Sequence, residues 1–186
     1  MSIRLVINDK LELRKYPNLD ELRISNDNFN EELNDLQEGL KVLIIMSKRF
    51  NQELNKLPKS LKVLKILGCV NFNQELNNLP EGLKELEIVL CSKFNQELNN
   101  LPEDLEELKI EYCEKFNQEL KNLPEGLEVL EIHKCVKFNK KLDNLPLSLK
   151  KLEIRKEYLE CYSLEEVIDM MPLGCELYID GKKKWL

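Results

Sequence analysis

The sequence predicts a repeat solenoid of the α/β type, an arc whose parallel strands form one concave sheet, whose convex side is mostly non-helical and whose ends are capped. Two observations predict this fold. The 22 residues that begin at Phe72, FNQELNNLPEGLKELEIVLCSK, are followed by 22 more that open with the same ten letters, FNQELNNLPE. The frame L-x-x-L-x-I also recurs once in every copy. One copy alone cannot bury its apolar residues, so the copies must stack.

Phenylalanine marks each copy of the repeat. All six phenylalanines lie 21 or 22 residues apart, and an asparagine follows each one: Phe29, Phe50, Phe72, Phe94, Phe116 and Phe138. We expect their rings to form a spine along the convex side. We expect the asparagines to satisfy backbone groups inside the turns and not to recognise a ligand.

The frame L-x-x-L-x-I predicts one short strand per copy, because its Leu and Ile alternate with outward-facing positions. The frames are Leu19/Leu22/Ile24, Leu40/Leu43/Ile45, Leu61/Leu64/Ile66, Leu83/Leu86/Ile88, Leu105/Leu108/Ile110, Leu127/Leu130/Ile132 and Leu149/Leu152/Ile154. The segment FNQELNNLPEG is too short and too interrupted for a helix, so it predicts an extended return.

These patterns divide a single domain, residues 1–186, into three parts. Residues 1–18 form an N-terminal cap with a strand at I-x-L-x-I, 19–160 form about seven repeats of 21–22 residues, and 161–186 form a C-terminal cap. In the last part, SLEEVIDMM predicts a short helix with a capping box between Ser163 and Glu166. Asp180-Gly181 predicts a closing hairpin.

The unit F-N-Q-E-L-x-N-L-P-x-x-L-x-x-L-x-I resembles the FNIP repeat, a leucine-rich-repeat subtype found in social amoebae and in giant viruses of amoebae. The resemblance covers residues 29–154 and implies a leucine-rich-repeat arc that binds proteins. Where many members carry proline, this chain has Glu53, Glu75, Glu97 and Glu119. Many members also begin with an F-box, for which the 28 residues before Phe29 leave no room. Recruitment of a ubiquitin ligase would therefore need a separate F-box chain.

Composition argues against several classes of partner. A net charge of −6 and a pI near 5.1 disfavour nucleic acid, which needs a basic face. No apolar run approaches the ~20 residues of a membrane helix, and the first residues hold no secretory segment. Six cysteines without a signal peptide indicate a reducing compartment. We therefore expect a cytoplasmic protein, located in the host cytoplasm if the chain is viral.

Cys69, Cys91, Cys113 and Cys135 recur every 22 residues. In line along the stack they would span about 14 Å, which is too far for one zinc ion. We interpret them as small buried groups that donate weakly to the backbone of the next turn, with Asp27 and Lys48 at the equivalent place in the two shorter turns. Cys161 and Cys175 lie outside this series and are expected to be free thiols. We expect no metal and no cofactor.

The sequence offers no set of catalytic residues. His133 is the single histidine, and no nucleophile signature, phosphate-binding loop or metal motif accompanies it. Carboxylate pairs such as Glu106 and Glu107 are typical of a solvated face. We therefore expect a protein that is not an enzyme.

Outward positions of the frames predict where a partner would bind. From Lys65 to Glu131 the central position alternates in charge between neighbouring strands, which favours ion pairs across the sheet. In the earlier frames several outward positions are apolar, whereas farther along Glu111, His133 and Arg155 are polar. Two further apolar residues lie at the edge of the sheet. These candidate binding residues are Val42, Ile44, Met46, Val63, Leu67, Val89, Leu90 and Tyr112.

Exposed apolar groups with a polar rim commonly mark an interaction site, so the main hypothesis is a scaffold that binds an unidentified protein through the concave face. Two simpler explanations are that Val and Ile are present because they suit strands, or that the N-terminal cap folds over this side. A second hypothesis is a homodimer, which would make the chain a structural module. A third is an adaptor that delivers host proteins for ubiquitination together with a separate F-box chain.

Overall fold

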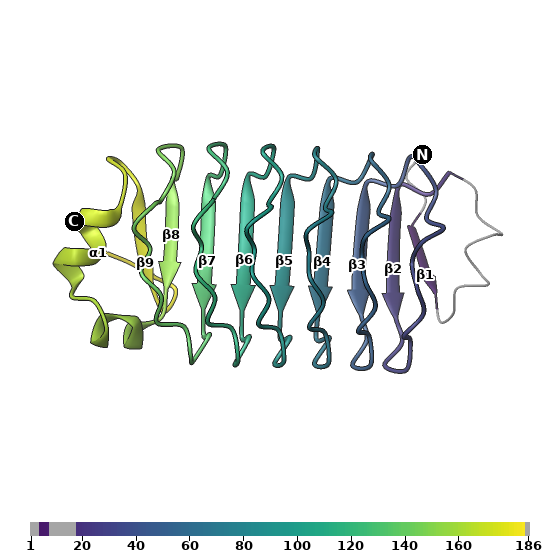
Figure 1. Ribbon diagram of the computed structural model, residues 1–186, viewed down its shortest axis with the longest axis horizontal. Coiled ribbons are helices and arrows are strands. Elements are labelled where there is room, and N and C mark those ends of the chain that lie inside the picture. Colours follow the sequence, from purple (N-terminus) through teal and green to yellow (C-terminus); the bar gives the residue numbers. More distant parts are fainter. Residues whose placement is uncertain (1–3, 8–17, 185–186) are drawn as a thin grey trace.

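The computed structural model describes residues 4–7 and 18–184, and shows a single row of strands with one turn of chain per strand (Figure 1). The strands are β1 (Arg4–Ile7), β2 (Glu21–Ser25), β3 (Val42–Met46), β4 (Val63–Leu67), β5 (Glu85–Val89), β6 (Glu107–Glu111), β7 (Val129–His133), β8 (Lys151–Ile154), β9 (Glu176–Ile179) and β10 (Lys182–Lys183). They form one sheet in chain order, parallel from β1 to β9, with β10 antiparallel to β9. The predicted solenoid of parallel strands is confirmed. The remainder of the predicted N-terminal cap, 1–3 and 8–17, lies outside the described residues.

Neighbouring strands pair without any shift in register, so like residues form straight ladders. Leu22 lies opposite Leu43, Ile24 lies opposite Ile45, and both ladders continue strand by strand to β9. From β2 onward these Leu and Ile side chains are buried, as the frame predicted. Each turn thus covers the apolar face of the turn before it.

The phenylalanine rings stack inside the solenoid. Successive ring centroids lie 5.8–6.2 Å apart with interplanar angles of 7–18°, and every ring is buried. The predicted spine exists and is longer than expected, because Tyr158 continues it 5.8 Å from Phe138. Sequence reasoning missed Tyr158 because it is not a phenylalanine and follows Phe138 by 20 residues.

In the turns after the strands, equivalent positions are found by counting backward from the phenylalanine. In every turn the Phe N–H donates to the carbonyl three residues earlier, at 2.9–3.2 Å, and that residue is Asn26, Ser47 or one of the four cysteines of the series. Ser47 and Asn26 therefore occupy the cysteine position in the short turns. The prediction that Lys48 and Asp27 occupy the cysteine position was wrong, because the short turns have one residue fewer between the isoleucine and the phenylalanine.

Two polar ladders connect the turns. The Cys Sγ atoms donate to the carbonyl of Ile45, Ile66, Ile88 or Ile110 at 3.1–3.5 Å, in the preceding turn and not in the next one as expected. Hydrogen bonds with the Cys113 thiol, together with burial, raise the pKa of the Cys91 and Cys135 thiols, so both stay protonated. Each repeat asparagine from Asn30 to Asn117 accepts the backbone N–H of its counterpart one turn later, at 2.8–3.1 Å. The asparagines thus have the structural role expected, although they lie at the surface.

The C-terminal cap follows the predicted order. A 3-10 helix η2 (Lys156–Glu160) carries Tyr158, and helix α1 (Leu164–Met170) begins at Ser163 with both bonds of the capping box present. Strands β9 and β10 then form the hairpin around Asp180 and Gly181. In the described part of the chain, no helix has the length and apolar character needed to cross a membrane.

Candidate protein-binding surface

The outer face of the sheet carries charged and apolar positions, and the two kinds overlap on β4 and β5. Its later strands carry the predicted alternation of charges, and the lysines are ion-paired within the chain. Lys65 contacts Glu85 at 2.5 Å and Glu87 at 3.2 Å, and Lys151 contacts Glu131 at 2.6 Å. These groups are partly buried, so the pairs help hold the strands together. They leave little unsatisfied charge for a partner.

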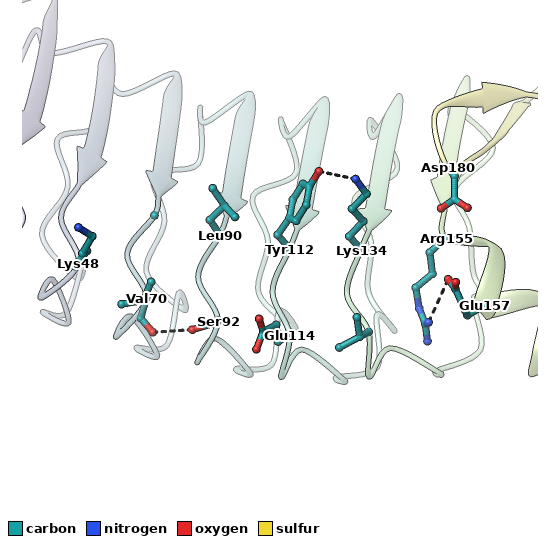
Figure 2. Close-up of a pocket in the computed structure, with 12 residues that line it drawn as sticks. Lys48, Val70, Leu90, Ser92, Tyr112, Glu114, Lys134, Arg155, Glu157 and Asp180 are labelled. Atoms are coloured by element: carbon teal, nitrogen blue, oxygen red, sulfur yellow. Dashed lines mark hydrogen bonds and ion pairs between the residues drawn. The ribbon is translucent and has the colours of Figure 1, made fainter.

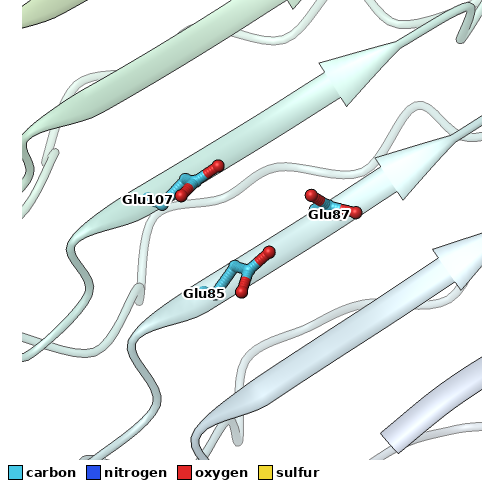
Figure 3. A group of neighbouring side chains, drawn as sticks. All are labelled: Glu85, Glu87 and Glu107. Atoms are coloured by element: carbon cyan, nitrogen blue, oxygen red, sulfur yellow. The ribbon is translucent and has the colours of Figure 1, made fainter. Parts of the chain in front are cut away.

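Three carboxylates of this region lie close enough together to suggest a metal site. Ligand atoms of Glu85, Glu87 and Glu107 all lie within 4.8 Å of one another (Figure 3). The ammonium groups of Lys65 and Lys109 contact the same carboxylates, Lys109 bonding Glu107 and lying 3.7 Å from Glu87. The lysines already supply the countercharge that a cation would bring, so the cluster is explained as part of the ion-pair ladder.

Among the acidic groups of this face, Glu111 has the most strongly raised pKa. Burial, together with a hydrogen bond and charge repulsion from Glu131, raises the pKa of the Glu111 carboxyl to about 7. Its partner in the register is His133, which lies 3.5 Å from Asp180 and 3.9 Å from Glu153. This arrangement concentrates titratable groups near the C-terminal cap and provides no nucleophile.

The predicted apolar residues lie on β3, β4 and β5 and at the edge of the sheet, and they differ in exposure. Val42, Met46, Val63, Leu67 and Val89 are half-buried; we call these five the face patch. Ile44 faces outward between Arg23 and Lys65 but is only 7% exposed, so it offers little surface to a partner. Leu90 and Tyr112, placed at the edge by the sequence, are the most exposed of the predicted set, at 52% and 38%.

An open trough of about 960 Å³ runs along the edge of the sheet where the strands end (Figure 2). Leu90 and Tyr112 line it together with Val136, which is 58% exposed. The Lys134 ammonium donates to the Tyr112 hydroxyl at 2.7 Å and lies 4.7 Å from the centre of its ring. Sequence reasoning missed Val136, although its place two residues before Phe138 matches that of Val70 before Phe72 in the same trough.

Three residues of this trough are held in a strained backbone conformation. The long turns insert one residue between the strand and the cysteine, and its φ is positive: 64° at Gly68, 57° at Leu90, 53° at Tyr112 and 54° at Lys134. Glycine adopts this left-handed region without cost, whereas other residues are destabilised by about 1 kcal/mol or more. We call Leu90, Tyr112 and Lys134 the ledge. Strain retained in three consecutive turns points to a use for these side chains.

Comparison with known proteins identifies the architecture. No protein-family model and no curated protein matches the sequence. Among solved structures, CroV588 from the giant virus CroV, described as a novel circular leucine-rich-repeat protein, is similar over 90% of this chain, with a TM-score of 0.67 and 29% identity. The chain is a leucine-rich-repeat solenoid. The match spans 28% of CroV588, so this leucine-rich-repeat chain covers little more than a quarter of that protein's length.

Proposed function

We propose that this leucine-rich-repeat solenoid is a non-catalytic scaffold that binds a protein partner across the face patch and the ledge. The observation that carries the proposal is the ledge itself, where Leu90 and Tyr112 remain exposed at a cost in backbone strain that glycine would avoid. Leucine-rich-repeat folds commonly mediate protein–protein interaction, which agrees with this use of the surface.

The face patch supports the same function because it is continuous with the ledge. Val89, the last residue of β5, precedes Leu90 directly, and Val89 pairs with Leu67 of the neighbouring strand. From β4 onward the charged side chains of the face neutralise one another, so the apolar side chains beside them are left to recognise another protein. Apolar contact areas bordered by polar groups are typical of such sites.

The resemblance of the repeat to the FNIP subtype bears on the organism and the compartment in which this scaffold would act. The FNIP-like motif and the similarity to CroV588 agree with a protein of a giant virus that acts in the host cytoplasm. The homo-oligomeric module and the adaptor that works with a separate F-box chain are the two competing functions, and both would use the solenoid as a binding surface.

Affinity capture from cells that express the protein tests the proposal. The wild-type bait is compared with two double variants, Leu90→Gly/Tyr112→Gly on the ledge and Met46→Glu/Leu67→Glu on the face patch. A partner retained by wild type should be lost with both double variants, while far-ultraviolet circular dichroism stays unchanged. A Lys56→Glu bait, altered on the return segment, should retain the partner. If every partner survives both surface changes, neither the ledge nor the face patch is the binding surface.

A further inference from the structure

The two long edges of the solenoid carry opposite charges. Turns that follow the strands lie along one edge, and turns that precede them lie along the other (Figure 1). The first set, the basic edge, comprises the exposed residues Arg49, Lys93, Lys115 and Lys137. The second set, the acidic edge, comprises the exposed residues Glu38, Glu81, Glu103 and Glu125.

None of these eight residues forms an ion pair within the described part of the chain. Lys93 donates to the Asn71 amide oxygen at 2.7 Å and has no carboxylate partner among those residues. This differs from the sheet face, where the lysines are paired. It also differs from the column just inside the acidic edge, where Lys84 bonds Glu106 and Lys150 contacts Glu128 at 2.6 Å. Unpaired like charges one strand spacing apart repel each other, and an opposing row would relieve that repulsion.

The opposing row that fits best is present on the same molecule. Each acid precedes the strand that its basic counterpart follows: Glu81 and Lys93 flank β5, Glu103 and Lys115 flank β6, Glu125 and Lys137 flank β7, and Glu38 and Arg49 flank β3. A second copy displaced along the strand direction therefore brings an acid to each of the four bases. The spacing matches automatically, because both rows repeat once per turn.

The charge pattern also selects the register of such a contact. Without a shift, the two rows make four opposite-charge pairs and no like-charge pair, since β4 contributes Lys59 and the neutral Asn71. A shift of one turn in one direction leaves two opposite pairs and sets Arg49 against Lys59. A shift of one turn in the other direction also leaves two opposite-charge pairs and places Lys93 against Lys59. In the unshifted register Glu114, an acid beside the bases, is unfavourable, whereas Asp104 adds to the negative charge of the acidic row.

We propose that copies of this chain associate edge to edge, with the basic edge of one against the acidic edge of the next and without a shift between turns. The contact joins two different surfaces, so each copy keeps one free edge of each charge and the assembly is open-ended. The occupant of either edge is a second copy of this chain. The proposal uses neither the face patch nor the ledge, and it is independent of the scaffold function proposed above.

Sedimentation velocity and light scattering of the purified full chain test this association. We expect a mass that grows with protein concentration at an ionic strength of about 0.01 M, where the screening length is ~30 Å. We expect a monomer at about 1 M, where that length is ~3 Å. A chain that stays monomeric at low salt and high concentration would overturn the proposal.

Charge reversal separates the proposal from general charge effects. Lys93→Glu/Lys115→Glu/Lys137→Glu gives two acidic edges, and Glu81→Lys/Glu103→Lys/Glu125→Lys gives two basic edges. Each variant alone should be monomeric at low salt, whereas an equimolar mixture should regain the association of wild type. Folded variants that fail to associate on mixing would refute the contact.

A matched control carries the same change in net charge away from the edges. Lys56→Glu/Lys140→Glu/Lys141→Glu alters three lysines of the return segments and should associate as wild type does. If this control dissociates as fully as the basic-edge reversal, net charge and not edge pairing governs association. Met46→Glu/Leu67→Glu should leave the association unchanged even if it abolishes capture of a partner, which distinguishes failure of one proposal from failure of the other.

Discussion

Short turns follow β2 and β3, whereas long turns follow β4 to β7. The two kinds of turn fill the same buried position with different polar side chains. In the short turn after β3, the buried Ser47 hydroxyl donates to the Phe29 carbonyl at 2.7 Å. In a long turn, a buried thiol such as Cys113 donates to the preceding turn at 3.3 Å. The added residue lies between strand and cysteine with positive φ and projects into the trough. Lengthening the turn by one residue thus leaves the core unchanged and adds a side chain at the surface.

The largest effect should be independent of turn length. Phe50→Ala in a short turn and Phe94→Ala in a long turn should each lower the free energy of unfolding by about 3–5 kcal/mol, because each removes a buried ring stacked on both sides. Urea denaturation followed by circular dichroism measures both. A clearly larger loss in one variant would show that the two kinds of turn do not share one core.

The hydroxyl of the short turn should matter more than the thiol of the long turn. Ser47→Ala leaves the buried Phe29 carbonyl without its hydroxyl donor and should cost about 1–3 kcal/mol, whereas Cys113→Ala removes a weaker donor and should cost about 1 kcal/mol. The same denaturation series compares them. Equal losses would mean that filling space, and not hydrogen bonding, is what this position requires.

The sequence predicted the features that repeat and missed those that depend on exceptions. Identical spacing predicted the strands, their register and the ring stack, because ladders of like residues must coincide in a solenoid. Ser47 and Tyr158 were missed because each breaks the pattern in identity and in spacing. The left-handed conformation of Leu90 and Tyr112 could not be predicted, since neither residue favours it. The 7% exposure of Ile44 depends on how its neighbours pack over it and not on which way the strand alternates.

A dependence on pH should belong to the long-turn region. Glu111 occupies the strand position that is Met46 in the short-turn region, and its pKa is raised to about 7 by burial and by Glu131. The folded state therefore keeps this proton between pH 4.5 and about 7, while the unfolded chain loses it. The stability contributed by the protonated group is present below pH 4.5 and is lost as the pH rises through 7.

Glu111→Gln should remove this loss. We expect the free energy of unfolding at pH 8 to rise by about 1 kcal/mol relative to wild type, a value reduced for solvent screening at a half-exposed site, with little difference near pH 4. Glu128→Gln, on an exposed ion pair with Lys150, is the control and should not reproduce the pH dependence. Parallel denaturation curves for wild type and Glu111→Gln across pH 4–8 would rule out this assignment.

The smallest predicted change tests the ledge most directly. Leu90→Gly should raise the free energy of unfolding by up to about 1 kcal/mol, or leave it unchanged once the flexibility of the unfolded glycine is offset, because φ is 57°. Gly68→Ala, at φ 64° with open space around the added Cβ, should lower it by about 1 kcal/mol. Thermal melts of the two variants give the comparison. If Leu90→Gly keeps or raises the stability of the chain and abolishes binding of the partner, the leucine serves recognition. A marked loss of stability would instead show that the leucine is part of the packing.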